Sequence, residues 1–340
     1  MLHFDCDYME GAHPEVMRRL VETNLEQSPG YGLDPHTAHA RELIRRACGA
    51  PDAEVYLLVG GTQTNATVID GLLRRHEGVL AATTGHINVH EAGAIEAAGH
   101  KVLTLPEHEG KVRAEEVERY IDDFYRDETC EHMVAPGMLY ISHPTELGTL
   151  YSLTELKALH DVCRRHAIPL YMDGARLSYA LAAEENTLSL HDIARLCDAF
   201  YIGGTKTGLL FGEAVVARPG LLPHFFTLVK QHGALLAKGR LLGLQFETLF
   251  TDGLYLRIAR QAITTARRLR EALLRKGYRP YIDSPTNQLF FVLPNSEIDR
   301  LSQYATFELW GARGKEESVV RFVTSWATGE QQVDELIARL

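Results

Sequence analysis

Between residues 54 and 217 the sequence alternates short apolar runs with longer segments of helical periodicity, and this alternation restricts the possible folds more than any other feature. Seven runs are typical of β-strands: residues 54–59, 79–83, 101–105, 138–142, 169–173, 198–202 and 213–217. The segments between them predict helices at residues 64–76, 89–98, 114–126, 152–166 and 189–197. This order predicts an α/β domain with a mostly parallel seven-stranded sheet and helices on both faces.

After residue 217 the pattern changes, which indicates a second structural unit. Residues 221–277 are typical of long helices, with one clear break at Thr251-Asp252-Gly253. Short strands are predicted at 288–293, 307–310 and 318–323, and Thr328 is predicted to cap a closing helix over 330–340. Helices are also predicted at 13–23 and 35–48. We therefore divide the chain into residues 1–245, the N-terminal segment with the large domain, and residues 246–340, a small α/β domain.

The composition limits the partners that this chain could have. A formal net charge of −10 argues against nucleic acid or an anionic membrane as the main partner. No apolar run approaches the roughly 20 residues of a membrane span, and no signal peptide is visible. The five cysteines form no C-x-x-C pair and are odd in number, which favours free thiols and a cytoplasmic location.

Ligands of open α/β sheets bind beyond the carboxyl ends of the strands, so the residues that follow each predicted strand are candidates for a site. After the first strand, Gly60 and Gly61 let a ligand approach the backbone, and a helix begins near Thr62 and Gln63. A helix N-terminus presents N–H groups that suit a phosphate. The alternative is a tight turn capped by Thr62; the stretch is neither G-x-G-x-x-G nor a P-loop.

Two further strand ends carry groups that could act on a ligand. His86 follows the second strand, where an imidazole can stack on a flat ring or move a proton. An ordinary surface or core histidine is the alternative, and a metal site of His86 and His90 lacks a third ligand. Asp173 ends the fifth strand and Arg176 follows it, and a carboxylate at this place can keep a heterocyclic nitrogen protonated; the alternative is an internal ion pair of these two residues.

Lys206 follows the sixth strand, although lysine is rare in this chain and absent before residue 101. Desolvation lowers the pKa of a lysine and makes its amine nucleophilic and able to form a Schiff base. The alternative is a solvated lysine on a turn, but Gly203 and Gly204 favour the first interpretation because they clear space around the chain. A phosphate loop, a stacking histidine, a carboxylate and a Schiff-base lysine together match the needs of pyridoxal 5'-phosphate.

With these residues in view, the sequence resembles the threonine aldolase / β-eliminating lyase family of fold-type I pyridoxal-phosphate-dependent enzymes over nearly its whole length. The resemblance implies an aspartate-aminotransferase-like large domain with a small C-terminal α/β domain. The matching stretches are Tyr31-Gly32-Leu33-Asp34-Pro35, Gly61-Thr62-Gln63-Thr64-Asn65, His86 with Glu91-Ala92-Gly93, Asp173-Gly174-Ala175-Arg176, Thr205-Lys206 and Val320-Arg321-Phe322-Val323-Thr324.

The resemblance implies roles for individual residues. Lys206 would form the Schiff base, His86 would stack on the cofactor ring, and Asp173 would pair with the ring nitrogen. Other cofactor contacts are implied for Gly61, Thr62, Gln63, Arg176, Thr205 and, from a neighbouring subunit, Arg240. Substrate contacts are implied for Cys6, Tyr31, Arg176 and Arg321. Arg321 would bind the substrate carboxylate in a bidentate manner. The family is typically oligomeric, so a homodimer or homotetramer with sites at subunit interfaces is expected.

The stretches that depart from the family pattern lie on the substrate side. Cys6 takes the place of a serine, Glu146 takes the place of a histidine near the substrate hydroxyl, and the residues after Lys206 read Thr207-Gly208-Leu209-Leu210. The implied reaction is cleavage of an L-β-hydroxy-α-amino acid such as threonine or allo-threonine to glycine and an aldehyde. The base would be His86, Glu146 or a held water.

Three alternatives remain open at the level of sequence. The same cofactor could serve β-elimination or transamination of another L-amino acid. The protein could bind the cofactor without catalysis. A nucleotide-binding protein could use the Gly60-Gly61 loop and Lys206 as a phosphate site, although no Walker lysine or dinucleotide fingerprint supports this.

Overall fold

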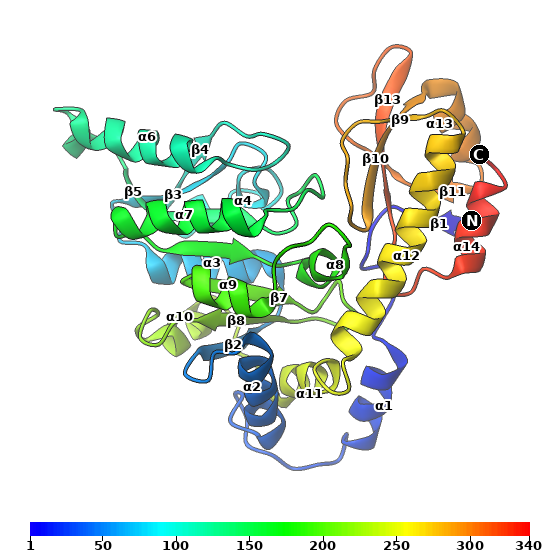
Figure 1. The fold of residues 1–340 in the computed structure, drawn as a ribbon. Coiled ribbons are helices and arrows are strands. Elements are labelled where there is room, and N and C mark those ends of the chain that lie inside the picture. Colours follow the sequence, from blue (N-terminus) through cyan, green and yellow to red (C-terminus); the bar gives the residue numbers. More distant parts are fainter.

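The computed structural model describes residues 1–340 and is built around a seven-stranded sheet (Figure 1). The strand order is β2-β8-β7-β6-β5-β3-β4, and only β8 runs antiparallel to its neighbours. All seven predicted strands are confirmed, and so is the mostly parallel sheet. The strands are β2 (Glu54–Leu58), β3 (Glu77–Ala82), β4 (Lys101–Leu105), β5 (Ala135–Ser142), β6 (Leu170–Asp173), β7 (Ala199–Gly203) and β8 (Glu213–Ala217).

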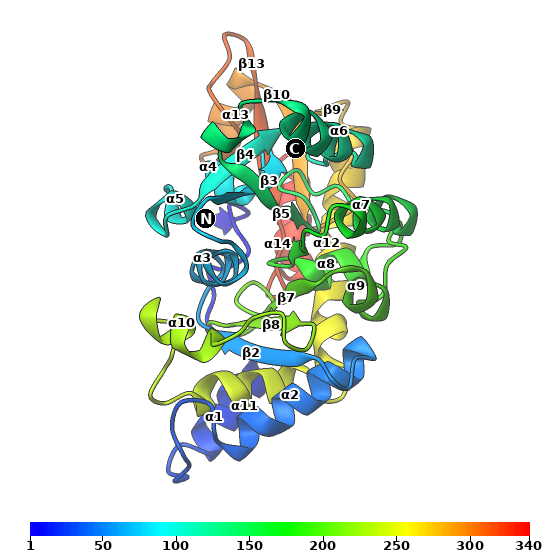
Figure 2. The same ribbon diagram turned by 90° about the vertical axis from the view of Figure 1, so that its left-hand side faces the viewer.

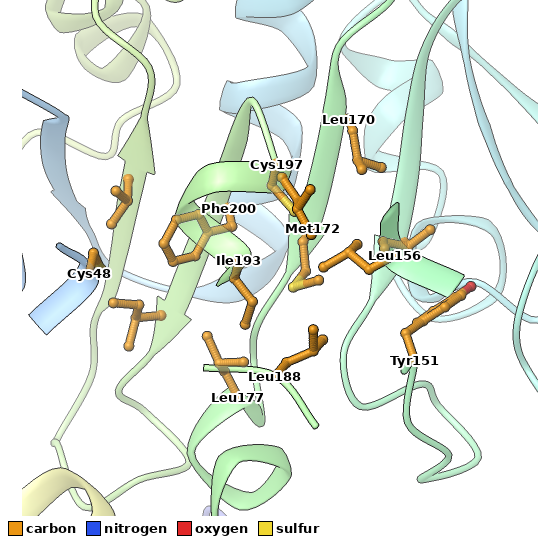
Figure 3. Close-up of a cluster of buried hydrophobic side chains, with 14 of the residues drawn as sticks. Cys48, Tyr151, Leu156, Leu170, Met172, Leu177, Leu188, Ile193, Cys197 and Phe200 are labelled. Carbon is orange, nitrogen blue, oxygen red and sulfur yellow. The ribbon is translucent and has the colours of Figure 1, made fainter. Parts of the chain in front are cut away.

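Helices cover both faces of this sheet because successive strand residues point to opposite sides. Tyr140 and Tyr201 belong to the apolar cluster under α3 and α10, whereas their neighbours Leu139 and Phe200 belong to the larger cluster under α7 and α9. Figure 2 shows these two helical layers on either side of the strands, and Figure 3 shows part of the larger cluster around Phe200. The helices are α3 (Gly61–Leu72), α6 (Ala114–Arg126), α7 (Leu153–Arg165), α8 (Leu177–Ala182), α9 (Leu190–Leu196) and α10 (Phe225–Gln231), with a 3-10 turn at η1 (Cys130–His132).

Two predicted helical stretches contain breaks that the sequence patterns did not predict. The helix predicted over 89–98 is wrong: the chain forms two single turns, α4 (His86–Val89) and α5 (Ala94–Ala97), because Ala92 and Gly93 adopt positive φ angles of 52° and 73°. In the stretch 221–277, the predicted break near Asp252 is confirmed, but a second break occurs at Gly233, where φ is 68°. This stretch therefore forms α10, α11 (Arg240–Leu249) and α12 (Leu254–Arg275).

The C-terminal part carries its own antiparallel sheet, in the order β12-β13-β10-β9. The predicted cap at Thr328 is wrong: Gly329 stands at the N-cap of the last helix, and the Thr328 hydroxyl instead accepts a hydrogen bond from Ser325 N at 2.8 Å. Sequence patterns also missed α8 and α13. The elements are β9 (Arg279–Pro280), β10 (Gln288–Pro294), α13 (Asn295–Leu301), β11 (Ala305–Thr306), β12 (Glu308–Leu309), β13 (Glu317–Val323) and α14 (Glu330–Ile337).

The beginning of the chain lies against this C-terminal part. Strand β1 (Leu2–His3) pairs in parallel with β11, and Leu2 and Phe4 are buried in the apolar core of the C-terminal sheet. Figure 1 accordingly shows both termini on the same side of the molecule, while α1 (Pro14–Glu22) and α2 (Pro35–Cys48) lie below the large sheet with α11. The domain division at residue 245 stays a prediction. None of the helices has the length and apolar character that a membrane span requires.

Candidate active site

The N-terminus of α3 lies at the carboxyl end of β2, as the glycine pair predicts. Gly60 is the N-cap and offers no capping side chain, and the first backbone hydrogen bond runs from Thr64 N to Gly60 O. The N–H groups of Gly61, Thr62 and Gln63 therefore have no partner within the helix. No atom comes within 4 Å of the position that a side chain on Gly60 would take. The alternative of a turn capped by Thr62 is wrong, because Thr62 lies inside the helix.

Asp173 ends β6 in a fully bonded, buried position. Its Oδ1 accepts hydrogen bonds from Tyr201 Oη at 2.6 Å and Ala175 N at 2.9 Å. Its Oδ2 accepts from Tyr140 Oη at 2.7 Å and Asn65 Nδ2 at 2.9 Å. Burial acts to raise the pKa of Asp173, but the charge of His86 and these hydrogen bonds outweigh it, so the pKa lies below its usual value. Asp173 is therefore held as a carboxylate.

His86 lies beside Asp173 and is oriented by a second buried carboxylate. Its Nδ1 lies 2.7 Å from Glu91 Oε1, and Asn65 Nδ2 donates to that same oxygen at 2.8 Å. His86, Glu91 and Asp173 each place one ligand atom within 4.8 Å of the others, a spacing that a metal ion could use. The Asn65 amide N–H donates to both carboxylates, and a cation would have to displace that donor. His90 is turned toward Trp310, with ring centroids 5.9 Å apart.

Lys206 follows β7, and its Nζ forms no hydrogen bond or ion pair within the chain. Burial lowers its pKa, and the charge of Arg176 acts in the same direction, while nearby carboxylates oppose both. The segment before it is tied to a buried glutamate: Thr205 Oγ1 donates to Glu213 Oε1 at 2.8 Å, and Gly204 N donates to Glu213 Oε2 at 3.2 Å. Burial raises the pKa of Glu213 to about 8. The hydroxyl of Thr205, a predicted cofactor contact, therefore already donates its proton to a hydrogen bond with Glu213.

Arg176 forms an internal ion pair, but not with Asp173. Its Nε and Nη2 donate to the two oxygens of Asp7 at 2.7 and 3.0 Å, and Asn287 Nδ2 also donates to Asp7 at 2.9 Å. Asp7 is fully buried. Burial acts to raise its pKa, but the charges of Arg176 and Lys206 bring it below the usual value. The alternative of an internal Asp173–Arg176 ion pair is wrong, because the guanidinium of Arg176 is paired with Asp7.

A cavity of about 240 Å³ gathers much of the predicted site. Its lining includes the predicted residues Lys206, His86, Glu146, Arg176 and Arg321, from both parts of the chain. The other lining residues are Tyr8, His90, Gln288, Glu308 and Trp310.

Arg321 reaches the cavity from β13. Its Nη1 donates to Gln288 Oε1 at 3.0 Å, its Nη2 is paired with Glu308, and its guanidinium carbon lies 5.2 Å from the centroid of Trp310. Burial lowers the pKa of Arg321, and so does the charge of Arg176. The cavity therefore contains two desolvated guanidinium groups, those of Arg321 and Arg176, and the second is paired with the fully buried Asp7.

Glu146 lines the cavity, and its two oxygens differ in their hydrogen-bond partners. Oε1 accepts hydrogen bonds from Ser142 Oγ at 2.6 Å and His86 N at 2.8 Å, whereas Oε2 has no partner in the chain. Burial raises the pKa of Glu146, and the charge of Asp173 acts in the same direction.

Eight predicted site residues do not line this cavity: Gly61, Thr62, Gln63, Asp173 and Thr205, which are described above, and three more. Tyr31 lies beside the segment that precedes α11: its N donates to Ala237 O at 3.1 Å, and Lys230 Nζ lies 4.7 Å from the centroid of its ring. Arg240 Nη2 donates to Asn24 O at 3.3 Å in the same region. Cys6 lies next to Asp7 outside the lining, and burial raises the pKa of its thiol.

Comparison with known proteins agrees with this geometry. A family model for β-eliminating lyases matches residues 4–294. The chain belongs to this family. The low-specificity L-threonine aldolase of Pseudomonas aeruginosa is 30% identical to it over 343 residues, which cover 98% of this chain and 95% of that protein.

Solved structures extend the comparison. A threonine aldolase of Leishmania major is 41% identical, has a TM-score of 0.96 and covers 99% of this chain and 98% of its own. An aspartate aminotransferase of Thermus thermophilus, at 17% identity and a TM-score of 0.71, covers 100% of this chain and 90% of its own and shows the fold alone. The aspartate-aminotransferase-like fold is thus confirmed for this member of the β-eliminating lyase family.

Sequence patterns missed several residues of this lyase site. They share the property of orienting another group: Asp7, Asn65, Glu91, Tyr140, Ser142, Tyr201 and Glu213. A signal existed for four of them: Asn65 and Glu91 stand in stretches that match the family, and Tyr140 and Ser142 stand two residues apart at the end of a strand and must share a face. Asp7 gave none, since its partner Arg176 lies 169 residues away.

Proposed function

We propose that this protein is a pyridoxal-phosphate-dependent aldolase that cleaves L-threonine-like β-hydroxy-α-amino acids to glycine and an aldehyde. The names of its relatives support this reaction class. The single observation that carries it is the cavity that combines an unpaired, desolvated Lys206 with His86, Glu146 and Arg321. Such a cavity offers a nucleophilic amine, a proton acceptor and a carboxylate-binding fork to one small molecule.

The residues present fit pyridoxal phosphate. The unpaired N–H groups of Gly61, Thr62 and Gln63 suit its phosphate, and the open space beside Gly60 admits it. Asp173, held ionised, suits a protonated ring nitrogen; His86 lies beside it for stacking, and Lys206 supplies the amine. When bound, the cofactor supplies a ring that accepts the electron pair released at the substrate α-carbon.

We assign the substrate carboxylate to Arg321. A substrate carboxylate that enters the cavity must displace Glu308 from the guanidinium of Arg321. Glu308 is a half-exposed side chain on the edge strand β12. Bidentate contact would then orient the α-carbon of the amino acid. Arg176 is less suited to this role, because its Nε and Nη2 already donate hydrogen bonds to Asp7.

We assign the base to Glu146. Its Oε2 is the unpartnered oxygen at the cavity, whereas His86 Nδ1 is already bonded to Glu91. The ionised form of Glu146 would remove the proton of the substrate β-hydroxyl as the Cα–Cβ bond breaks. Turnover that is undiminished in the Glu146→Gln variant would remove this residue from the role.

The reaction is tested by product analysis. Purified protein supplied with pyridoxal phosphate is incubated with L-threonine, L-allo-threonine, serine and cysteine, and the products are identified. We expect glycine and acetaldehyde in equal amounts from the threonines, lost in Lys206→Ala and kept in Lys157→Ala, a control on the exposed face of α7. A keto acid with ammonia would indicate β-elimination instead, and an aminated acceptor would indicate transamination.

We further propose that the protein forms a homodimer or homotetramer. Tyr31 and Arg240 lie together, away from the cavity of their own chain, beside the exposed apolar side chains of Leu33 and Phe226. In an oligomer this surface would bring Arg240 to the phosphate of a neighbouring subunit. Light scattering of the purified protein measures the assembly, and a monomer would contradict it. The five cysteines are free thiols, which suits the cytoplasmic location that the sequence predicts.

A further inference from the structure

Tyr140 and Ser142 connect the two carboxylates of the site, and the proposed reaction assigns neither of them a role. Both project from β5 toward the face covered by α3, because they stand two residues apart on one strand. Ser142 is the register partner of Asp173 on β6. Both residues are buried, with exposed fractions of 1% for Tyr140 and 9% for Ser142.

The four side chains form a continuous chain of oxygen contacts. Asp173 Oδ2 lies 2.7 Å from Tyr140 Oη, Tyr140 Oη lies 3.1 Å from Ser142 Oγ, and Ser142 Oγ lies 2.6 Å from Glu146 Oε1. All three distances are within hydrogen-bond range. The chain therefore runs from the partner of the ring nitrogen to the proposed base.

Counting protons shows that this chain is incomplete when both carboxyl groups are ionised. Each of the two hydroxyls carries one proton. Tyr140 donates its proton to Asp173, and Ser142 donates its proton to Glu146. No proton is then left for the contact between Tyr140 and Ser142, so three contacts share two protons and two buried oxygens face each other without a hydrogen bond.

We propose that Tyr140 and Ser142 form with Asp173 and Glu146 a hydrogen-bond chain that takes up one further proton, and that Glu146 is where this proton resides. With the proton on Oε1, Glu146 donates to Ser142, Ser142 donates to Tyr140, and Tyr140 donates to Asp173. All three contacts are then hydrogen bonds.

The surroundings of the two carboxyl groups decide which of them holds the proton. Asp173 accepts three other hydrogen bonds, from Asn65, Tyr201 and Ala175, which favour its ionised form. Glu146 accepts fewer from other residues, namely one from His86 N, besides the contribution of its own backbone N–H. The directions of their pKa values agree, because that of Asp173 is lowered and that of Glu146 is raised.

The consequence for catalysis rests on the proposed function. If ionised Glu146 removes the β-hydroxyl proton, Tyr140 controls the pH at which the base becomes available without touching the substrate. Tyr140 and Ser142 are thus positioning residues. The titratable groups that face Glu146 or share its cavity also act on that pH and must stay unchanged in any test: His86, Asp173, Tyr151, Lys206, Arg176, Tyr8, His90, Glu308 and Arg321.

Tyr140→Phe separates this chain from simple electrostatics. In the variant, a neutral Glu146 that donates to Ser142 leaves the Ser142 proton without an acceptor, so the ionised form is favoured. The pKa of Glu146 should fall by about one unit, the size of one hydrogen bond. If only electrostatics acted, the pKa of Glu146 would rise in this variant, because Asp173 loses a hydrogen-bond donor that partly offsets its negative charge.

The readout is infrared spectroscopy of the holoenzyme without substrate. The carbonyl stretch of a neutral carboxyl group at residue 146 is isolated by subtracting the spectrum of Glu146→Gln, which removes the contribution of Glu213. In the wild type we expect this band to persist at pH values where exposed glutamates, with pKa near about 4.3, are ionised. Its absence there would overturn the proposal, whether or not the Tyr140 variant folds.

In Tyr140→Phe the midpoint of the band should move down by about one pH unit, and the acid limb of kcat/KM should move with it. Tyr171→Phe is the matched control. Tyr171 is buried on the same face of the sheet, but its hydroxyl donates to Asn65 Oδ1 and is not part of the hydrogen-bond chain, so this substitution should leave the midpoint of the band unchanged. An unchanged or raised midpoint in Tyr140→Phe would refute the chain. The infrared result needs no substrate, so it stands apart from any failure of the proposed aldolase reaction.

Discussion

Replacement of Asp173 by asparagine tests the electrostatic core of the site. Each oxygen of Asp173 accepts two hydrogen bonds, one from a hydroxyl group and one from an N–H group. The hydroxyl groups can rotate, but the N–H groups, Ala175 N at Oδ1 and Asn65 Nδ2 at Oδ2, cannot. The amide nitrogen of an asparagine must face one of these N–H groups in either orientation. One buried donor is then left unpaired, so the free energy of unfolding should fall by about 1–3 kcal/mol.

The same variant should lose activity far more than stability. The chain still folds, because a loss of this size is a fraction of the roughly 5–15 kcal/mol typical of a domain. Loss of the carboxylate should lower kcat by about 10²–10³-fold, the range seen when one charge-stabilising group is removed. Urea unfolding gives the first quantity, aldehyde release gives the second, and absorbance of the bound cofactor shows that it still binds.

Asp198→Asn provides a matched control. Asp198 is also buried and accepts a backbone N–H, from Leu170 at 2.7 Å, but it stands before β7, at the opposite end of the sheet from Lys206. It should lose stability and keep kcat. A near-normal kcat in Asp173→Asn, or an equal loss of kcat in both variants, would refute the reasoning.

Three further predictions follow from the geometry. Arg321→Lys loses bidentate contact and should raise KM for the amino acid by about 10–100-fold with little change in kcat; a kcat effect alone would contradict the assignment. Asp7→Asn leaves Arg176 buried without its counter-ion, and urea unfolding should show a loss of about 3–5 kcal/mol; a loss under 1 kcal/mol would contradict the pairing. Burial lowers the pKa of His143 to about 4 from 6.5, so the unfolded chain binds a proton between these pH values that the native chain does not. Acidification across that window should therefore reduce the free energy of unfolding by about 3 kcal/mol more in the wild type than in His143→Gln, and equal pH slopes would refute this.

The strands could be predicted from the sequence because burial on both faces leaves apolar runs that few other structures produce. Lys206, Asp173 and His86 could be located for a related reason: polar residues at the carboxyl ends of such runs, or a few residues beyond them, lie at one edge of the sheet. The N-terminus of α3 was predictable from its glycines.

The partners of these groups could not be predicted, because they depend on contacts between distant segments. Asp7 meets Arg176 only after the start of the chain packs on the C-terminal part. The break at residues 92–93 begins with a left-handed backbone at Ala92, a residue type that gives no local signal, although Gly93 beside it can adopt this conformation readily. Thr205 is a hydroxyl next to the lysine, and only the fold shows that Glu213 holds it.

The most direct test of the account is to identify the residue that carries the cofactor. Holoenzyme is treated with borohydride, digested and examined by mass spectrometry for a pyridoxyl group. We predict a yellow protein that bleaches on reduction, with the label on the peptide that contains Lys206 and none after Lys206→Ala. A colourless protein that ignores added pyridoxal phosphate, or a label confined to other lysines, would contradict it.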